Sequence, residues 1–152
     1  MRIKAKKSLG QNFLVDKNII KLIANVAEIN EKDTLLEIGP GTGSLTDELI
    51  LKKPKKIIVV EKDKILSKNL KNNYGNAIKI INDDILKIKE EELSNDRMIF
   101  FGNLPYNIST QIFTKWIKLR KLNQISKKFI LMFQKEVADR IIETTNKKNY
   151  GR

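Results

Sequence analysis

The sequence TLLEIGPGTG at residues 34–43 decides the fold, because a mostly aliphatic run ends there in a glycine-rich turn. Residues 34–38 are too few for a typical helix and predict a buried strand. Glycine at positions 39, 41 and 43 lets the backbone turn sharply and lets a ligand approach without a Cβ atom in the way. In open α/β sheets, ligands bind where such a strand ends. We therefore expect a ligand site here, and the alternative is a tight strand-to-helix turn without a ligand.

Outward from this turn, strand and helix patterns alternate along the chain. Further strands are predicted at residues 56–60, 77–81, 98–101 and 128–133. Helices are predicted after an N-cap at Asp16, at 44–51, from Asp63 to about Leu70, at 108–117 and at 136–143. The strands are apolar on both faces, which is typical of a parallel sheet covered by helices on both sides. The sequence thus predicts an α/β protein with a doubly wound, mainly parallel sheet.

Composition narrows the chemistry, because the 152 residues contain no cysteine and no histidine. These absences exclude a disulfide framework, a Cys/His zinc site and a nucleophile activated by histidine, and we expect no bound metal. No run of 18 apolar residues occurs, and no apolar core or cleavage site follows the basic N-terminus. We therefore expect a cytoplasmic protein that does not enter the membrane.

Positive charge is unevenly distributed along the chain, whose formal net charge is +12. Residues 115–152 carry 11 basic and 3 acidic side chains, whereas residues 1–114 carry 19 and 15. Such an excess indicates a surface that neutralises nucleic-acid phosphates, although a general bias toward lysine would also produce it. The lysines that we expect to contact RNA are Lys6, Lys7, Lys127, Lys128, Lys147 and Lys148.

Acidic residues follow the second and third predicted strands. Glu61 stands 22 residues after Gly39, where a carboxylate can accept hydrogen bonds from both hydroxyl groups of a ribose. A dinucleotide-binding turn would need a third glycine at position 44 or 46, and a phosphate-binding P-loop would need Gly-Lys-Ser/Thr; the chain has neither. The third strand ends in Asn82, Asp83 and Asp84, where a carboxylate can reach an adenine amino group. The competing hypothesis is that Asp83 and Asp84 bind a metal as a pair.

The most specific motif is Asn103, Leu104, Pro105 and Tyr106, at the end of the fourth predicted strand. The amino group of a nucleobase is a poor nucleophile because its lone pair is delocalised into the ring. An asparagine oxygen and a backbone carbonyl that accept its two protons would hold the nitrogen closer to tetrahedral geometry and free that lone pair. Pro105 stiffens the loop, and Tyr106 offers a ring on which a base can stack. The alternative is a proline turn with a packed tyrosine.

Six segments resemble one family of enzymes in their order and spacing: residues 6–14, 37–46, 59–63, 84–86, 102–110 and 132–138. The family is that of the ribosomal RNA adenine dimethyltransferases, and the likeness is to its small-subunit branch (KsgA type). The resemblance implies a Rossmann-like class I methyltransferase that uses S-adenosyl-L-methionine. Such an enzyme transfers methyl groups to the 6-amino groups of adenines in small-subunit (16S-type) ribosomal RNA as that subunit matures.

The resemblance also implies a role for individual residues around the cofactor. Asn12 and Leu14 would line its methionine end, and Gly39, Gly41 and Gly43 would form the floor beneath it. Glu61 would bind the ribose and Asp84 the adenine amino group. Asn103 would lie between the cofactor and the target base, and the catalytic residues would be Asn103, Leu104, Pro105 and Tyr106.

Two features depart from the family pattern. Gln111 stands where the family usually has proline after Ile-Ser-Thr, which lies beyond the site. Family members also continue into further strands and a small helical domain, so we expect residues 1–152 to be a truncated methyltransferase core without that domain, acting as a monomer on the small ribosomal subunit precursor. Other hypotheses are an adenine methyltransferase for large-subunit RNA or DNA, and a non-catalytic RNA-binding fragment.

Overall fold

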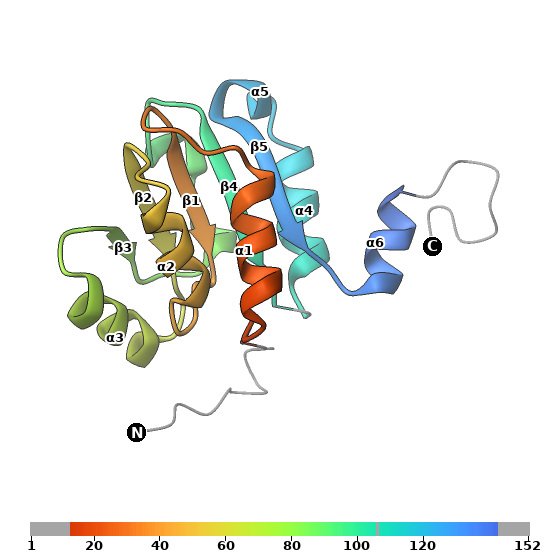
Figure 1. Ribbon diagram of the computed structural model, residues 1–152. Helices are drawn as coiled ribbons and strands as arrows, with labels where there is room; N and C mark the ends of the chain where they lie inside the picture. The colour runs from red at the N-terminus through yellow and green to blue at the C-terminus, as the bar shows by residue number, and fades with distance from the viewer. Residues whose placement is uncertain (1–12, 106, 143–152) are drawn as a thin grey trace.

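A five-stranded parallel sheet forms the centre of the molecule (Figure 1), as the computed structural model shows for residues 13–105 and 107–142. The strands are β1 (Thr34–Ile38), β2 (Lys56–Val60), β3 (Lys79–Ile81), β4 (Met98–Asn103) and β5 (Ser126–Met132). Their order across the sheet is β3-β2-β1-β4-β5, and every neighbouring pair is parallel. The predicted doubly wound α/β class is therefore confirmed.

Helices or 3-10 turns separate the strands along the chain, and aspartate side chains cap the starts of two of the helices. The helices are α1 (Lys17–Val26), α2 (Ser44–Leu51), α3 (Lys64–Tyr74), α4 (Ser109–Ile117), α5 (Leu122–Ile125) and α6 (Lys135–Ile142), with 3-10 turns η2 (Ile85–Lys87) and η3 (Glu90–Glu92). The side chain of Asp16 accepts hydrogen bonds from the first backbone N–H groups of α1, and that of Asp63 does the same for α3. Both predicted N-caps are thus confirmed.

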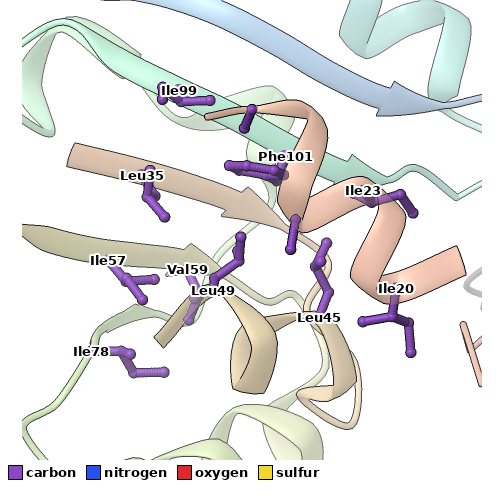
Figure 2. Close-up of a cluster of buried hydrophobic side chains, with 12 residues drawn as sticks. Ile20, Ile23, Leu35, Leu45, Leu49, Ile57, Val59, Ile78, Ile99 and Phe101 are labelled. Carbon is purple, nitrogen blue, oxygen red and sulfur yellow. The ribbon is translucent and has the colours of Figure 1, made fainter. Parts of the chain in front are cut away.

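Successive side chains of each strand point to opposite faces of the sheet, so the strands form two apolar cores, one on each face. Figure 2 shows the first core, in which Leu35 and Phe101 of the sheet face α1 and α2. The second core lies on the other face, where Leu36 and Phe100 pack with Trp116 of α4. Because helices cover both faces, the exposed ends of the strands are the parts of the sheet left for a ligand.

The edge strands differ from the predictions. The inner strands β1, β2 and β4 are almost fully buried, whereas the residues of β3 and β5 are mostly partly exposed. Both edge strands still pack apolar side chains against both cores, as predicted. The third strand begins at Lys79 instead of residue 77, because α3 continues past Leu70 to Tyr74 and a turn at residues 74–77 uses the intervening backbone. An edge strand is covered less completely, so its sequence can be more polar.

Strand β1 is the switch point of the sheet. Strands β2 and β3 follow it on one side, and β4 and β5 lie on its other side. In this fold class the ligand crevice lies at such a switch point, outside the carboxyl ends of the strands. Past β5, α6 stands away from the helices that cover the sheet, and none of its residues is buried (Figure 1). Within the described part of the chain, no helix combines the length and the apolar character needed to cross a membrane.

Candidate functional site

A cavity lies at the carboxyl ends of β1, β2, β3 and β4, where residues that follow each strand line it. A smaller cavity adjoins it and shares Phe13, Gly39, Gly41 and Asn103 with the larger one. The two cavities together extend from the glycine turn to the segment after β3. The structure therefore places a cavity where the sequence predicts a ligand site.

The glycine turn lines this space with two of its three glycines. Gly39 and Gly41 line both cavities with φ of 64° and 62°, a left-handed conformation that favours glycine. A Cβ atom at Gly41 would lie 3.0 Å from the Phe13 ring, so a larger residue would also press on the cavity wall. Gly43 lines neither cavity; a Cβ atom there would overlap the hydroxyl group of Tyr74. The structure thus does not bring Gly43 into the floor of the site.

Glu61 is a buried carboxylate at the wall of the larger cavity, with only 5% of its surface exposed. Its Oε2 atom accepts a hydrogen bond from the Gly41 backbone N–H (3.2 Å), and its Oε1 atom accepts one from the Asp63 backbone N–H (2.8 Å). Burial raises the pKa of Glu61, and the backbone donors oppose that rise. The carboxylate is thereby held between the glycine turn and the start of α3.

Asp84 lies on another wall of the same cavity, at the start of η2. Its Oδ2 atom accepts a hydrogen bond from Lys62 Nζ (2.8 Å), and its Oδ1 atom accepts one from the Leu86 backbone N–H (3.0 Å). The hydrogen bond from Lys62 lowers the pKa of Asp84, so the carboxylate stays ionised. Among residues 13–105 and 107–142, no group of three acidic side chains could hold a metal ion, so nothing there supports Asp83 and Asp84 as a metal pair.

The loop after β4 lines the cavity beside the glycine turn. Asn103 lines both cavities, and Leu104 and Pro105 line the larger one. Leu104 is 2% exposed and reaches into the second core, which anchors the loop. A Cβ atom at Gly102 would lie 2.6 Å from the Leu104 side chain, so the glycine before Asn103 leaves room for this anchor. Tyr106 lies outside the described residues.

Sequence reasoning missed two residues that line the smaller cavity, Phe13 and Glu37. Glu37 is 2% exposed and accepts a hydrogen bond from Thr46 Oγ1 (2.7 Å), and burial raises its pKa to about 8. An acidic residue inside the apolar run at 34–38 was the available signal, because a charged group rarely occupies a fully buried strand without a role. Leu14 lines the same cavity, whereas Asn12 lies outside the described residues.

Of the lysines predicted to contact RNA, the two that the structure describes lie away from the cavity. Lys127 and Lys128 lie at the amino end of β5, opposite the end that forms the site. Lys127 Nζ pairs with Asp33 (2.7 Å), and Lys128 Nζ contacts Glu28 (3.0 Å) and the Ala27 carbonyl (3.1 Å). Their charge is thus partly neutralised within the protein. Lys6, Lys7, Lys147 and Lys148 lie outside the described residues.

Comparison with known families identifies the chain. A profile of the family described as Ribosomal RNA adenine dimethylase matches residues 2–152. The chain belongs to this family. The match spans every residue of the site, from Phe13 to Ile108, so the cavity is built from residues within the family domain.

Curated relatives of the chain carry the name Ribosomal RNA small subunit methyltransferase A. The protein of Pelagibacter ubique (strain HTCC1062) is 54% identical over 152 residues, which are the whole chain and 58% of the relative. The protein of Wolbachia sp. subsp. Brugia malayi (strain TRS) is 45% identical over 98% of the chain and 57% of the relative. These matches confirm the likeness to the small-subunit branch. The chain spans somewhat more than half the length of the curated relatives that it matches.

Solved structures agree on the fold. A dimethyladenosine transferase from Plasmodium falciparum superposes with a TM-score of 0.78 at 31% identity, over 91% of this chain and 49% of that one. The 23S rRNA methyltransferase ErmE superposes with a TM-score of 0.73 at 28% identity, over 85% of this chain and 50% of that one. The sheet and its helices therefore form the Rossmann-like fold of class I methyltransferases, as the sequence predicts.

Proposed function

We propose that this chain carries the cofactor and catalytic site of an enzyme that transfers methyl groups from S-adenosyl-L-methionine to adenine 6-amino groups in small-subunit ribosomal RNA. The observation that carries the proposal is the space formed by the two adjoining cavities at the switch point of the sheet. The predicted residues that line this space are Gly39, Gly41, Glu61, Asp84 and Asn103. Family membership supplies the reaction class for that space.

The cavity residues fit this cofactor along its length. Glu61 is a buried carboxylate between the glycine turn and the Asp84 wall, which suits the two hydroxyl groups of a ribose. Asp84 is ionised and lies toward one end, where it can accept a hydrogen bond from an adenine amino group. Leu14 and Glu37 line the smaller cavity at the other end, which leaves that end for the methionine portion. When bound, the cofactor supplies an electrophilic methyl group on a sulfonium.

Asn103 lines both cavities, which supports a role for it between the cofactor and the target base. We expect its side-chain oxygen and a loop carbonyl to accept the two protons of the target amino group. Held in this way, the amino nitrogen would direct its lone pair toward the methyl group that the bound cofactor supplies, and a proton that it releases would pass to water. Catalysis would rest on proximity, orientation and these hydrogen bonds, without a general base. Tyr106 would stack on the target base.

The proposal extends to partners and place of action. The substrate would be ribosomal RNA in the precursor of the small subunit, and the protein would act in the cytoplasm, where that precursor is assembled. We propose that it acts as a monomer, because elements of a single chain build both cavities.

A second candidate substrate is large-subunit ribosomal RNA, because the structure of a 23S rRNA methyltransferase also superposes well. A transfer assay with radiolabelled S-adenosyl-L-methionine decides between the substrates. Precursor small subunits, naked large-subunit RNA and duplex DNA would be offered in parallel to the protein. We expect label in the small-subunit RNA alone. Label in large-subunit RNA or DNA would reassign the substrate, and RNA binding without transfer would leave a non-catalytic role.

A further inference from the structure

A buried ion pair lies behind the adenine wall of the cavity, outside the residues assigned to binding or catalysis. Glu90 of η3 is fully buried, and its Oε1 atom lies 2.7 Å from Lys115 Nζ of α4. The same oxygen accepts a hydrogen bond from the indole N–H of Trp116 (2.6 Å). The other oxygen, Oε2, has no hydrogen-bond partner in the part of the chain that the structure describes. Buried ion pairs of this kind contribute little net stability to the fold, so we ask whether this pair has a role in the cavity.

The Lys115 ammonium also holds the turn that follows Asp84. Besides Glu90, it donates hydrogen bonds to the backbone carbonyls of Ile85 (2.8 Å) and Ile88. An ammonium group has three hydrogens, so these acceptors match its full donor capacity. Ile85 directly follows Asp84 and lines the cavity, and the Asp84 side chain caps the same turn through the Leu86 N–H. Lys115 therefore fixes the backbone from which the Asp84 carboxylate projects.

Helix α4 connects Lys115 to the loop that contains Asn103. The helix begins at Ser109, immediately after that loop. Ile108, the residue before α4, lines the same cavity as Ile85. Lys115 thus joins the wall that carries Asp84 to the helix that anchors the loop on the other side. Glu90 supplies the charged acceptor among the three, and the indole N–H of Trp116 holds that same carboxylate oxygen in place.

We propose that Lys115, held by Glu90, is a positioning residue that fixes the Asp84 turn against α4 and thereby makes the cavity select the amino group of the cofactor's adenine. The inference rests on the proposed function, because it takes this cavity as the adenine site. It assigns to the buried pair a role in recognition that neither residue could have by direct contact.

Calorimetric titration with two ligands tests this role. S-adenosyl-L-homocysteine carries the adenine amino group, and S-inosyl-L-homocysteine replaces it with an oxygen. The main variant is Lys115→Met with Glu90→Gln, which removes both charges together and leaves an amide that can accept from Trp116. We expect this variant to bind the adenosyl ligand about tenfold more weakly, as for a lost charged hydrogen bond, and the inosyl ligand unchanged. Adding Asp84→Asn to this variant should not weaken binding of the adenosyl ligand further, because both changes remove the same contact between Asp84 and the adenine amino group.

The matched control is Lys118→Met, which removes an exposed lysine from the end of the same helix. It should leave both affinities unchanged. Equal losses for both ligands in the main variant would show a purely structural role and overturn the inference, as would unchanged discrimination between them. Failure of the wild-type protein to bind either ligand would instead contradict the proposed function. If the double variant does not fold in a thermal melt, Glu90→Gln alone, which leaves only the partly exposed Lys115 without its charged partner, provides the same comparison.

Discussion

At the scale of single residues, Glu61 gives the sharpest test of cofactor binding, because its carboxylate is buried, lines the cavity and is held by two backbone donors. We predict that Glu61→Ala weakens binding of S-adenosyl-L-methionine by about 1.5–3 kcal/mol, the contribution of charged hydrogen bonds to the ribose. Isothermal titration calorimetry measures the change, and Glu91→Ala, at an exposed position, is the control. Unchanged affinity would remove Glu61 from the site.

Asn103 should separate chemistry from binding. We predict that Asn103→Ala lowers kcat for methyl transfer by about 10²-fold or more, as expected when a transition state loses one preorganised hydrogen bond. The KM for S-adenosyl-L-methionine should change far less. Gln111→Ala, at an exposed position of the helix that follows this loop, is the matched control. Equal losses in turnover and cofactor affinity would show that Asn103 mainly holds the cofactor.

Glu37 makes stability depend on pH, because burial raises its pKa from 4.5 to about 8. The unfolded chain releases this proton near the lower value, whereas the folded chain keeps it until the higher one. Folding therefore loses up to about 1.4 kcal/mol for each pH unit as pH rises through this window. We predict that Glu37→Gln, which stays neutral, becomes more stable relative to the wild type between about pH 5 and pH 8.

Denaturant titrations at several pH values measure this difference. Glu31→Gln, at an exposed position, should not alter the pH dependence and serves as the control. A stability difference between Glu37→Gln and the wild type that is constant over the window would show that Glu37 is ionised in the folded protein.

At the scale of elements, the glycine turn, α2 and α3 meet where the Tyr74 hydroxyl group lies close to Gly43. Gly43 precedes α2 with φ of 92°, and Tyr74 at the end of α3 donates hydrogen bonds to the Gly43 carbonyl (3.1 Å) and to Asp47 (2.7 Å). We predict that Gly43→Ala destabilises the protein by at least about 2 kcal/mol, because it combines the backbone cost of a left-handed residue with a clash against Tyr74.

A double-mutant cycle separates these two costs. In a Tyr74→Ala background the clash disappears, so Gly43→Ala should cost only the backbone portion, about 1–2 kcal/mol. Chemical denaturation measures all four proteins. The same cost in both backgrounds would show that helix α3 shifts to admit the methyl group and that the close approach is not required.

At the scale of the whole molecule, the positive charge of the C-terminal third includes internal ion pairs, exposed residues such as Lys118 and Lys121, and lysines outside the described residues. Lys127 and Lys128 are paired with Asp33 and Glu28 at the end of the sheet opposite the cavity. We predict that Lys127→Gln with Lys128→Gln leaves the salt dependence of RNA binding unchanged. Lys147→Gln with Lys148→Gln should reduce its log–log slope by about 0.7–1 for each phosphate that the protein no longer neutralises.

Both double variants remove the same formal charge, so a difference between their slopes reports position instead of net charge. Fluorescence anisotropy with small-subunit RNA over a range of salt concentrations provides the measurement. Equal slopes for the two variants would indicate that the excess of lysine reflects composition. A larger reduction of the slope by the changes at positions 127 and 128 would show that these two lysines contact RNA, as the sequence predicts.

The sequence by itself determined the order of the elements, because each depends on a local pattern that neighbouring residues carry. Short apolar runs specify the strands, Asp16 and Asp63 cap the helices, and the glycines after β1 mark the turn. The same locality placed Glu61, Asp84 and Asn103 correctly at the cavity, since residues that follow parallel strands share one end of the sheet.

Only the tertiary structure decided which of these residues face the cavity and what holds them. Gly43 lies in the same turn as Gly41, yet Tyr74, 31 residues further along the chain, occupies the space beside it. The partners of Lys127 and Lys115 are likewise distant in sequence, 94 and 25 residues away. Such contacts depend on how the layers pack, and neither periodicity nor capping encodes packing between elements that are far apart in the chain.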